Sequence, residues 1–141
     1  MFKAAVSGAP VVNMTSAYGG IRWESGKSRM FQYEQTQSRI GGTLWDKPAE
    51  FIRNSPLFFL PQVQTPVLSM HNDKDGSVMW EQGIEFFMAL RRLDKPVWLF
   101  NYKGEGHHLK KWENRLDYSR RVMEFYDYYL KDGKKPEWMK S

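Results

Sequence analysis

The feature that most constrains this chain is the alternation of apolar segments along its second half. Residues 66–71 and 96–102 are short apolar runs, the first bounded by proline and asparagine. Residues 80–93 and 114–130 instead repeat their apolar side chains at helical spacing. Strand, helix, strand and helix in this order predict a parallel sheet covered by helices, because parallel neighbours need a long crossover connection. We therefore expect an α/β fold.

Helical spacing also predicts which side of each helix faces the sheet. The expected buried side chains of the first helix are Trp80, Ile84, Phe87, Met88 and Leu90, and those of the second are Leu116, Val122, Met123, Tyr126 and Leu130.

The first half has weaker periodicity. Residues 4–12 indicate a short buried strand that runs into a loop at 13–16, and residues 18–37 indicate an irregular segment with one short helix near 30–35. Residues 47–54 indicate a helix capped by Asp46, with Pro48 in its first turn, and Ser55-Pro56 begins a further helical turn.

Composition excludes several classes of site. The absence of cysteine excludes disulfides, thiolate metal sites and a cysteine nucleophile. The net charge of +5 is spread in isolated basic pairs, with no long basic run and no nucleic-acid motif, so we expect no nucleic-acid partner. No apolar run approaches the roughly 20 residues that cross a bilayer, so we expect no membrane partner.

Two loops are candidates for chemistry, because ligands of such sheets bind beyond the carboxyl ends of the strands. The loop at residues 71–78 carries Asp75, and the loop at residues 103–111 carries His107. A carboxylate and an imidazole that meet across the sheet edge are the acid–base pair of a hydrolytic triad. In α/β-hydrolases the triad follows the order serine, acid, histidine, so Asp75 before His107 fits the last two places.

Both loops resemble those of one family of serine peptidases. TPVLSMHNDKDGSV at residues 65–78 and FNYKGEGHHLKK at residues 100–111 are similar to the acid and histidine loops of the prolyl oligopeptidase family, which includes dipeptidyl and acylaminoacyl peptidases. The resemblance implies that Asp75 and His107 are catalytic and that the chain is the C-terminal portion of an α/β-hydrolase fold. Asn72 stands where the family usually has glycine, and asparagine also tolerates turn geometries.

The nucleophile is expected outside this sequence. Residues 1–20 resemble the family segment that follows the nucleophile helix, and Ser7, Ser25 and Ser69 each lack the glycine that precedes the serine of a nucleophile elbow. The serine and the oxyanion-hole amides are then expected upstream of Met1, and the chain alone is expected to be inactive.

The same resemblance divides the chain into functional segments. Residues 1–60 would hold the strand after the nucleophile and a substrate-pocket excursion, residues 61–133 the two catalytic loops with their strands and helices, and residues 134–141 a polar tail. The resemblance also implies that the pocket for the residue before the scissile bond is lined by Val11, Met14, Tyr18 and Val78. Apolar and aromatic walls suit proline, alanine or another uncharged side chain.

Nearby polar residues receive structural interpretations. His71 is expected to be a strand-end residue, His108 a neighbour of the base, and Asp73 and Glu105 solvent-exposed turn carboxylates. The adjacent pair His107-His108 on a loop, without a helical H-E-x-x-H pattern, is poor spacing for metal ligands. We expect neither a metal nor another cofactor.

These observations favour a serine peptidase acting on short peptides, releasing dipeptides or acyl-amino acids. Two alternatives remain open: an esterase or lipase of the same fold, and a non-catalytic module that self-associates through an exposed sheet edge. Resemblance alone favours a periplasmic or secreted protein.

Overall fold

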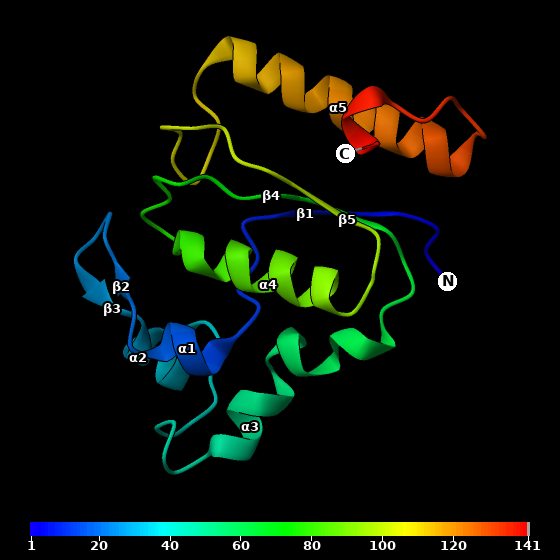
Figure 1. The fold of residues 1–141 in the computed structure, drawn as a ribbon. Coiled ribbons are helices and arrows are strands. Elements are labelled where there is room, and N and C mark those ends of the chain that lie inside the picture. Colours follow the sequence, from blue (N-terminus) through cyan, green and yellow to red (C-terminus); the bar gives the residue numbers. More distant parts are fainter. Residues whose placement is uncertain (141) are drawn as a thin grey trace.

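A three-stranded parallel sheet organises the protein (Figure 1), which the computed structural model describes over residues 1–140. Its strands are β1 (Ala5–Gly8), β4 (Val67–Met70) and β5 (Val97–Phe100), in the order β1-β4-β5. Helix α4 (Trp80–Arg92) covers one face and helix α5 (Trp112–Leu130) covers the other. The predicted parallel α/β arrangement is confirmed.

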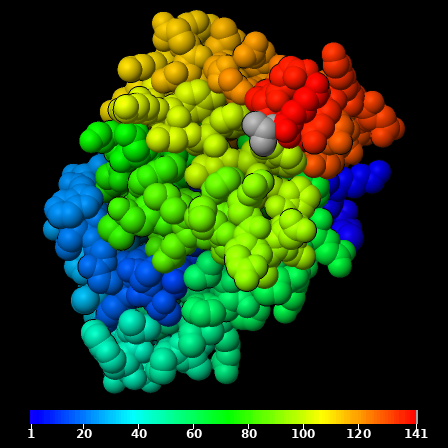
Figure 2. All heavy atoms as spheres, viewed as in Figure 1, coloured from blue at the N-terminus to red at the C-terminus, as the bar shows by residue number. Residues whose placement is uncertain are grey.

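Shorter elements fill the rest of the chain. They are α1 (Met14–Tyr18), β2 (Ile21–Arg22), β3 (Lys27–Ser28), α2 (Arg29–Phe31), a π-helix at Gln32–Thr36, α3 (Pro48–Arg53) and 3-10 helices at Pro56–Gln62 and Glu137–Met139. In the space-filling view, α1 and the β2–β3 hairpin (blue) lie along the left side of the molecule, below α5 (orange) (Figure 2).

The central strand β4 is buried at all four positions, which explains why it is apolar apart from Ser69. Val67 packs with Leu90 and Val97 in the cluster beneath α4. Leu68 points to the other face and packs with Phe125 of α5. Alternate residues of β4 therefore pack into two separate hydrophobic clusters, one on each face of the sheet.

The buried face of α4 differs from the predicted one. Leu90 is fully buried, but Ile84 is 38% exposed and Met88 57% exposed. The inward positions are instead taken by Gln82 and Gly83, which are both buried. Leu90 and Phe87 pack in the core as predicted, but a polar residue and a glycine carry no apolar signal, so the periodicity missed this part of the buried face.

Helix α5 shows the same kind of difference. Leu116, Met123 and Leu130 were predicted to be buried, yet each is more than half exposed. The helix packs on the sheet through Phe125 and the neighbouring aromatic residues, whose rings meet Trp98 of β5. The segment expected to be a polar tail also packs here, because Met139 is buried in the same cluster.

Two predictions for the first half of the chain are wrong. Where a loop was expected at residues 13–16, the Asn13 side chain accepts hydrogen bonds from the N–H groups of Thr15 and Ser16 and starts α1. Asp46 does not cap α3; its carboxylate accepts from the Thr43 backbone and hydroxyl instead. The β2–β3 hairpin was not predicted, because strands of two residues carry no detectable period.

Strand β1 lies at an edge of the sheet. Within residues 1–140 it pairs only with β4, in the register Ala5 with Val67 to Gly8 with Met70. No helix in this part of the chain is both long and apolar enough to cross a membrane.

Candidate active site

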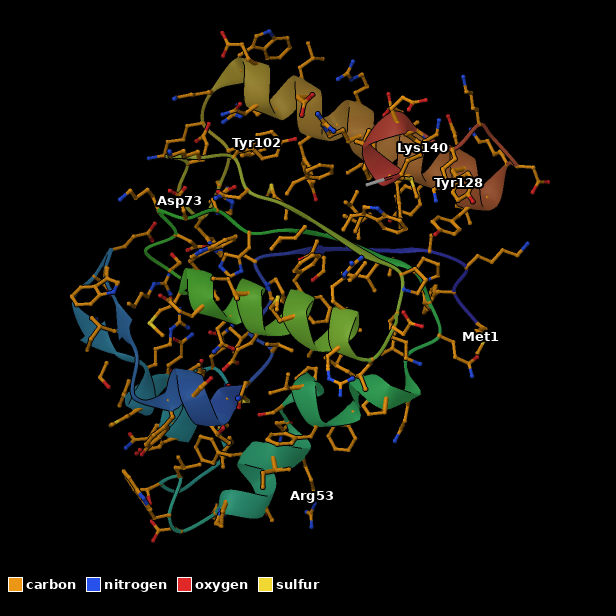
Figure 3. All side chains as sticks on the ribbon, viewed as in Figure 1. Met1, Arg53, Asp73, Tyr102, Tyr128 and Lys140 are labelled. Carbon is orange, nitrogen blue, oxygen red and sulfur yellow. The ribbon has the colours of Figure 1, made fainter. Side chains whose placement is uncertain are left out.

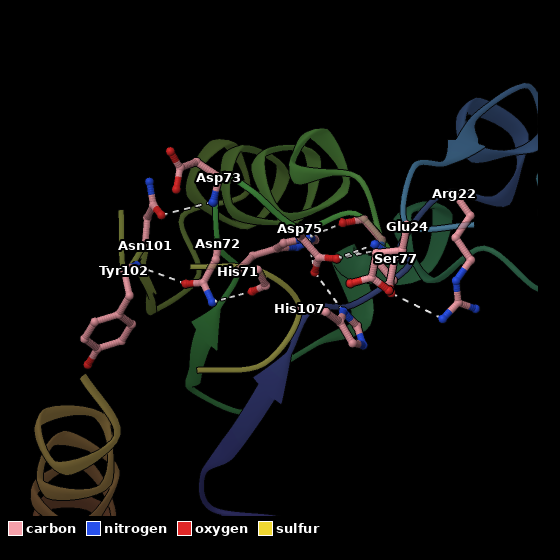
Figure 4. Close-up of polar contacts among 12 residues, drawn as sticks. Arg22, Glu24, His71, Asn72, Asp73, Asp75, Ser77, Asn101, Tyr102 and His107 are labelled. Carbon is pink, nitrogen blue, oxygen red and sulfur yellow. Dashed lines mark hydrogen bonds and ion pairs between the residues drawn. The ribbon is translucent and has the colours of Figure 1, made fainter. Parts of the chain in front are cut away.

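Asp75 and His107 meet at the carboxyl edge of the sheet. The register of the strands brings Met70 and Phe100 side by side, so the loops that follow β4 and β5 start at neighbouring points. One carboxylate oxygen of Asp75, Oδ2, lies 2.8 Å from Nδ1 of His107 (Figure 4). The structure thus brings together the two side chains that sequence reasoning selected.

The other oxygen of Asp75 fixes the orientation of the carboxylate. Oδ1 accepts hydrogen bonds from the backbone N–H groups of Ser77 and Val78, both at 2.8 Å. The side chain is almost completely buried, so it cannot exchange these partners for water. Asp75 therefore presents one oxygen, in one direction, to the imidazole.

This contact determines the tautomer of His107. A carboxylate can only accept, so Nδ1 of His107 carries the proton and donates it to Asp75. Its Nε2 has no hydrogen-bond partner within residues 1–140, and its side chain is 28% exposed. An unprotonated Nε2 that is open to its surroundings is what a general base requires.

His71 is close to the pair but has a structural role. It is fully buried, and Nε2 donates to the carbonyl of Val78 at 2.9 Å. Burial lowers the pKa of His71 and outweighs the nearby Asp75 carboxylate, so the ring is neutral. Through this hydrogen bond His71, at the end of β4, fixes the far end of the acid loop at Val78. This agrees with the structural role that was expected for it.

Asn72 ties the two loops together. Its amide Nδ2 donates to the carbonyl of Gly106 at 2.9 Å, and its Oδ1 accepts from the N–H of Tyr102 at 3.0 Å. Asp73 adds a third link, because its carboxylate accepts from the N–H of Gly104 at 2.8 Å. Sequence reasoning considered only the turn tolerance of Asn72 and missed this bridging role, which a glycine could not perform.

Glu105 is not the solvent-exposed carboxylate that was expected. It is buried, and its two oxygens accept from the N–H groups of Lys110 and Lys111 and from the Asn114 side chain, each at 2.9 Å. These hydrogen bonds lower the pKa of Glu105 to about 2. Glu105 thereby closes the histidine loop and joins it to the start of α5.

A cavity of about 340 Å³ lies beside His107. Val11, Met14 and Val78, three of the four residues proposed for the substrate pocket, line it together with His107. Tyr18 does not, because its ring packs edge-on against Phe51 in the core.

Among the lining residues that sequence reasoning missed are two arginines, Arg22 and Arg29. They belong to the β2–β3 hairpin and to the start of α2, so only the tertiary fold brings them to His107. The part of the chain that the structure describes holds no cluster of three or more histidine, aspartate or glutamate side chains that could bind a metal ion.

Known proteins with similar sequences are peptidases. The sequence model of the prolyl oligopeptidase family matches residues 1–133. The human acylamino-acid-releasing enzyme is 31% identical over 122 residues, which cover 82% of this chain and 16% of the human enzyme. Dipeptidyl-peptidase 5 of Schizosaccharomyces pombe is 30% identical over 93 residues, or 66% of this chain and 14% of that protein. The chain thus spans about a sixth of the length of these curated relatives.

Solved structures agree on the fold. The acylaminoacyl peptidase of Pyrococcus horikoshii superposes with a TM-score of 0.78 at 21% identity, covering 99% of this chain and 22% of that one. A puromycin-hydrolyzing peptidase of Mycobacterium tuberculosis gives a TM-score of 0.73 at 24% identity, with coverages of 92% and 18%. The described residues therefore match a part of the fold of these peptidases.

Proposed function

Because this chain belongs to the prolyl oligopeptidase family, we propose that it supplies the acid and the base of a serine peptidase triad. Asp75 is the acid and His107 the base. The observation that carries the proposal is the 2.8 Å contact between Asp75 Oδ2 and His107 Nδ1, which leaves Nε2 of His107 free.

The chemistry follows from this geometry. As a serine oxygen attacks the substrate carbonyl, Nε2 of His107 takes the hydroxyl proton, and the Asp75 carboxylate stabilises the imidazolium that forms. The imidazolium then gives this proton to the leaving amine, and the C–N bond breaks to leave an acyl-enzyme. In the second half, His107 takes a proton from water, which attacks the ester, and returns it to the serine oxygen.

We place the serine and the oxyanion-hole amides in a part of the polypeptide upstream of Met1. Ser7, Ser25 and Ser69 lack the elbow glycine. The open edge of β1 is where a further parallel strand would add to the sheet. Residues 1–141 by themselves would then be inactive, and the exposed edge would favour their self-association. Sedimentation of the isolated chain tests the last point, and a monodisperse monomer would contradict it.

The proposed substrates are short peptides, cleaved at an amide bond near the amino terminus. The test uses the full-length protein that contains this segment and two aminomethylcoumarin amides, one of a dipeptide with a free amino terminus and one of a single N-acetylated amino acid. Turnover of the dipeptide amide indicates dipeptidyl release, and turnover of the acetyl-amino-acid amide indicates acylaminoacyl release. His107→Ala should abolish either activity, and full activity in that variant would refute the proposal.

The esterase alternative needs a separate comparison, since the same triad hydrolyses esters. An amide and an ester with the same acyl group are offered to the full-length protein. Turnover of both supports a peptidase, because amides are the harder substrates. Turnover of the ester alone would favour the esterase.

A further inference from the structure

The cavity beside His107 has a cationic lining that the catalytic mechanism does not use. Arg22 and Arg29 both line it, and no aspartate or glutamate does. Arg22 extends from the β2–β3 hairpin toward the acid loop, where its Nη2 is 3.3 Å from the Ser77 hydroxyl (Figure 4). Two cationic side chains and the general base thus line the same cavity.

Arg29 is the unusual member of this lining, because it is buried without a counter-ion. The side chain and backbone together are only 4% exposed. Its Nη1 makes a long contact of 3.4 Å with the Gln32 side chain, and its Nη2 is buried with no hydrogen-bond partner within residues 1–140. Burying a guanidinium without a carboxylate has a large desolvation free energy. An anion from outside the described residues would offset it.

Two acidic side chains of the same region of the chain, Glu24 and Glu34, have other partners. Glu24 accepts a hydrogen bond from the Ser77 hydroxyl, and Glu34 accepts one from the Tyr18 hydroxyl. The Tyr33 hydroxyl, which also belongs to a residue of the cavity wall, is buried beside the Arg29 guanidinium. Burial raises the pKa of Tyr33 more than the neighbouring Arg29 lowers it, so the phenol keeps its proton and can donate it.

We propose that this cavity binds the carboxylate of an acidic side chain, so that the enzyme cleaves after glutamate or aspartate. This inference rests on the proposed peptidase function and names its substrate class. The planar fork of Arg29 suits a carboxylate, to which an arginine can donate two parallel hydrogen bonds. A volume of about 340 Å³ is within the range of small-ligand pockets. The prediction of an uncharged side chain considered only the apolar walls.

The position of His107 decides which substrate carboxylate is bound. His107 lines the same cavity as Arg22 and Arg29, so an anion bound by the arginines shares this cavity with the general base. Val11, Met14 and Val78 would contact the aliphatic part of that side chain, and the guanidinium of Arg29 its end. The residue before the scissile bond therefore fits the cavity better than a more distant part of the peptide does.

The test compares two coumarin amides that differ only in glutamate or glutamine before the scissile bond. These side chains have nearly the same shape, so the ratio of their kcat/KM values reports charge recognition alone. For the full-length enzyme we expect a Glu/Gln ratio of about 10 to 100, since a hydrogen bond to a charged group contributes about 1.5–3 kcal/mol. A ratio of one or less would overturn the inference and leave the peptidase function standing.

Variants of the cavity arginines distinguish a loss of charge recognition from a loss of folding. Arg29→Met keeps the aliphatic length and should bring the Glu/Gln ratio close to one. Arg29→Lys should retain part of the preference. Arg53→Met is the matched control, because Arg53 lies on α3 with its side chain 71% exposed, far from the acid loop (Figure 3). If Arg29→Met does not fold, Arg22→Met provides a second lining variant, which should also lower the ratio.

Direct binding covers the case in which neither substrate is cleaved and the peptidase proposal fails. N-acetyl-glutamic acid α-amide and its glutamine counterpart are titrated into the full-length protein by calorimetry. Binding of the glutamic compound alone, lost in Arg29→Met, supports the acidic site. Equal binding, or none, overturns it and indicates that a carboxylate from elsewhere in the polypeptide neutralises Arg29.

Discussion

Replacing Asp75 by asparagine tests the acid–base pair with the smallest change in shape. The carboxylate oxygen Oδ1 accepts from the N–H groups of Ser77 and Val78. In the variant the amide oxygen must stay on that side, because an NH₂ group there would face two donors. The NH₂ group then points at His107, where Oδ2 lies at 2.8 Å in the native protein.

This orientation reverses the tautomer of the imidazole. Nδ1 of His107 must now accept from the asparagine, so the proton moves to Nε2, which can no longer take a proton from the serine. The same exchange in a well-studied Ser-His-Asp triad lowers kcat about 10⁴-fold, or about 5.5 kcal/mol of transition-state stabilisation. We expect a loss of that order for Asp75→Asn in the full-length enzyme.

The assay is kcat for the preferred coumarin amide, with the thermal melting temperature as a check on folding. Asp73→Asn is the matched control in the same loop, because an asparagine oxygen can still accept from the N–H of Gly104. It should change kcat less than about threefold. A loss of under tenfold in Asp75→Asn, with an unchanged melting temperature, would refute the tautomer argument.

Three further changes test how the loops are held. In Gly83→Ala the new Cβ would lie 2.5 Å from Nδ1 of His71. Overpacking then outweighs the gain in helix propensity, so the free energy of unfolding should fall by about 1–2 kcal/mol in urea denaturation. The control Gly19→Ala, whose new Cβ meets no atom within 4 Å, should change it by less than about 0.5 kcal/mol, and equal effects of the two variants would contradict the overpacking. Asn72→Gly restores the glycine usual in the family yet removes two hydrogen bonds between the loops, so it should cost about 2–3 kcal/mol; an unchanged unfolding midpoint would exclude the bridging role. The folded pKa of Glu105 is about 2, below its ordinary value. The stability that its ionised carboxylate contributes is therefore present above about pH 4.5 and is lost as the pH falls toward 2. Glu105→Gln should flatten the pH dependence of the free energy of unfolding in that range, and an unchanged slope would contradict this role of Glu105.

The parts of the fold that the sequence predicted are those set by strong local patterns. A parallel strand covered on both faces appears as a mainly apolar run, which is why the strands within residues 66–71 and 96–102 were located correctly. The carboxyl ends of neighbouring parallel strands share one edge of the sheet. That topological rule predicts that the loops carrying Asp75 and His107 meet.

What the sequence did not predict depends on contacts between distant segments. The inward position of Gln82 follows from its hydrogen bonds to the N–H groups of Val12 and Asn13, about 70 residues away. Arg29 reaches the cavity because α2 and the short hairpin before it fold against the acid loop, where the Glu24 N–H donates to the carbonyl of Gly76. No local periodicity encodes such a meeting of segments.

The central claim is that residues 1–141 complete the triad of a larger serine hydrolase. The most direct measurement labels extracts of the source cells with a fluorophosphonate, which reacts with activated serines, and detects this segment with a specific antibody. We predict a labelled band far heavier than 16.7 kDa, the mass of residues 1–141. An unlabelled band near that mass would contradict the claim, because the chain would then stand alone without an activated serine.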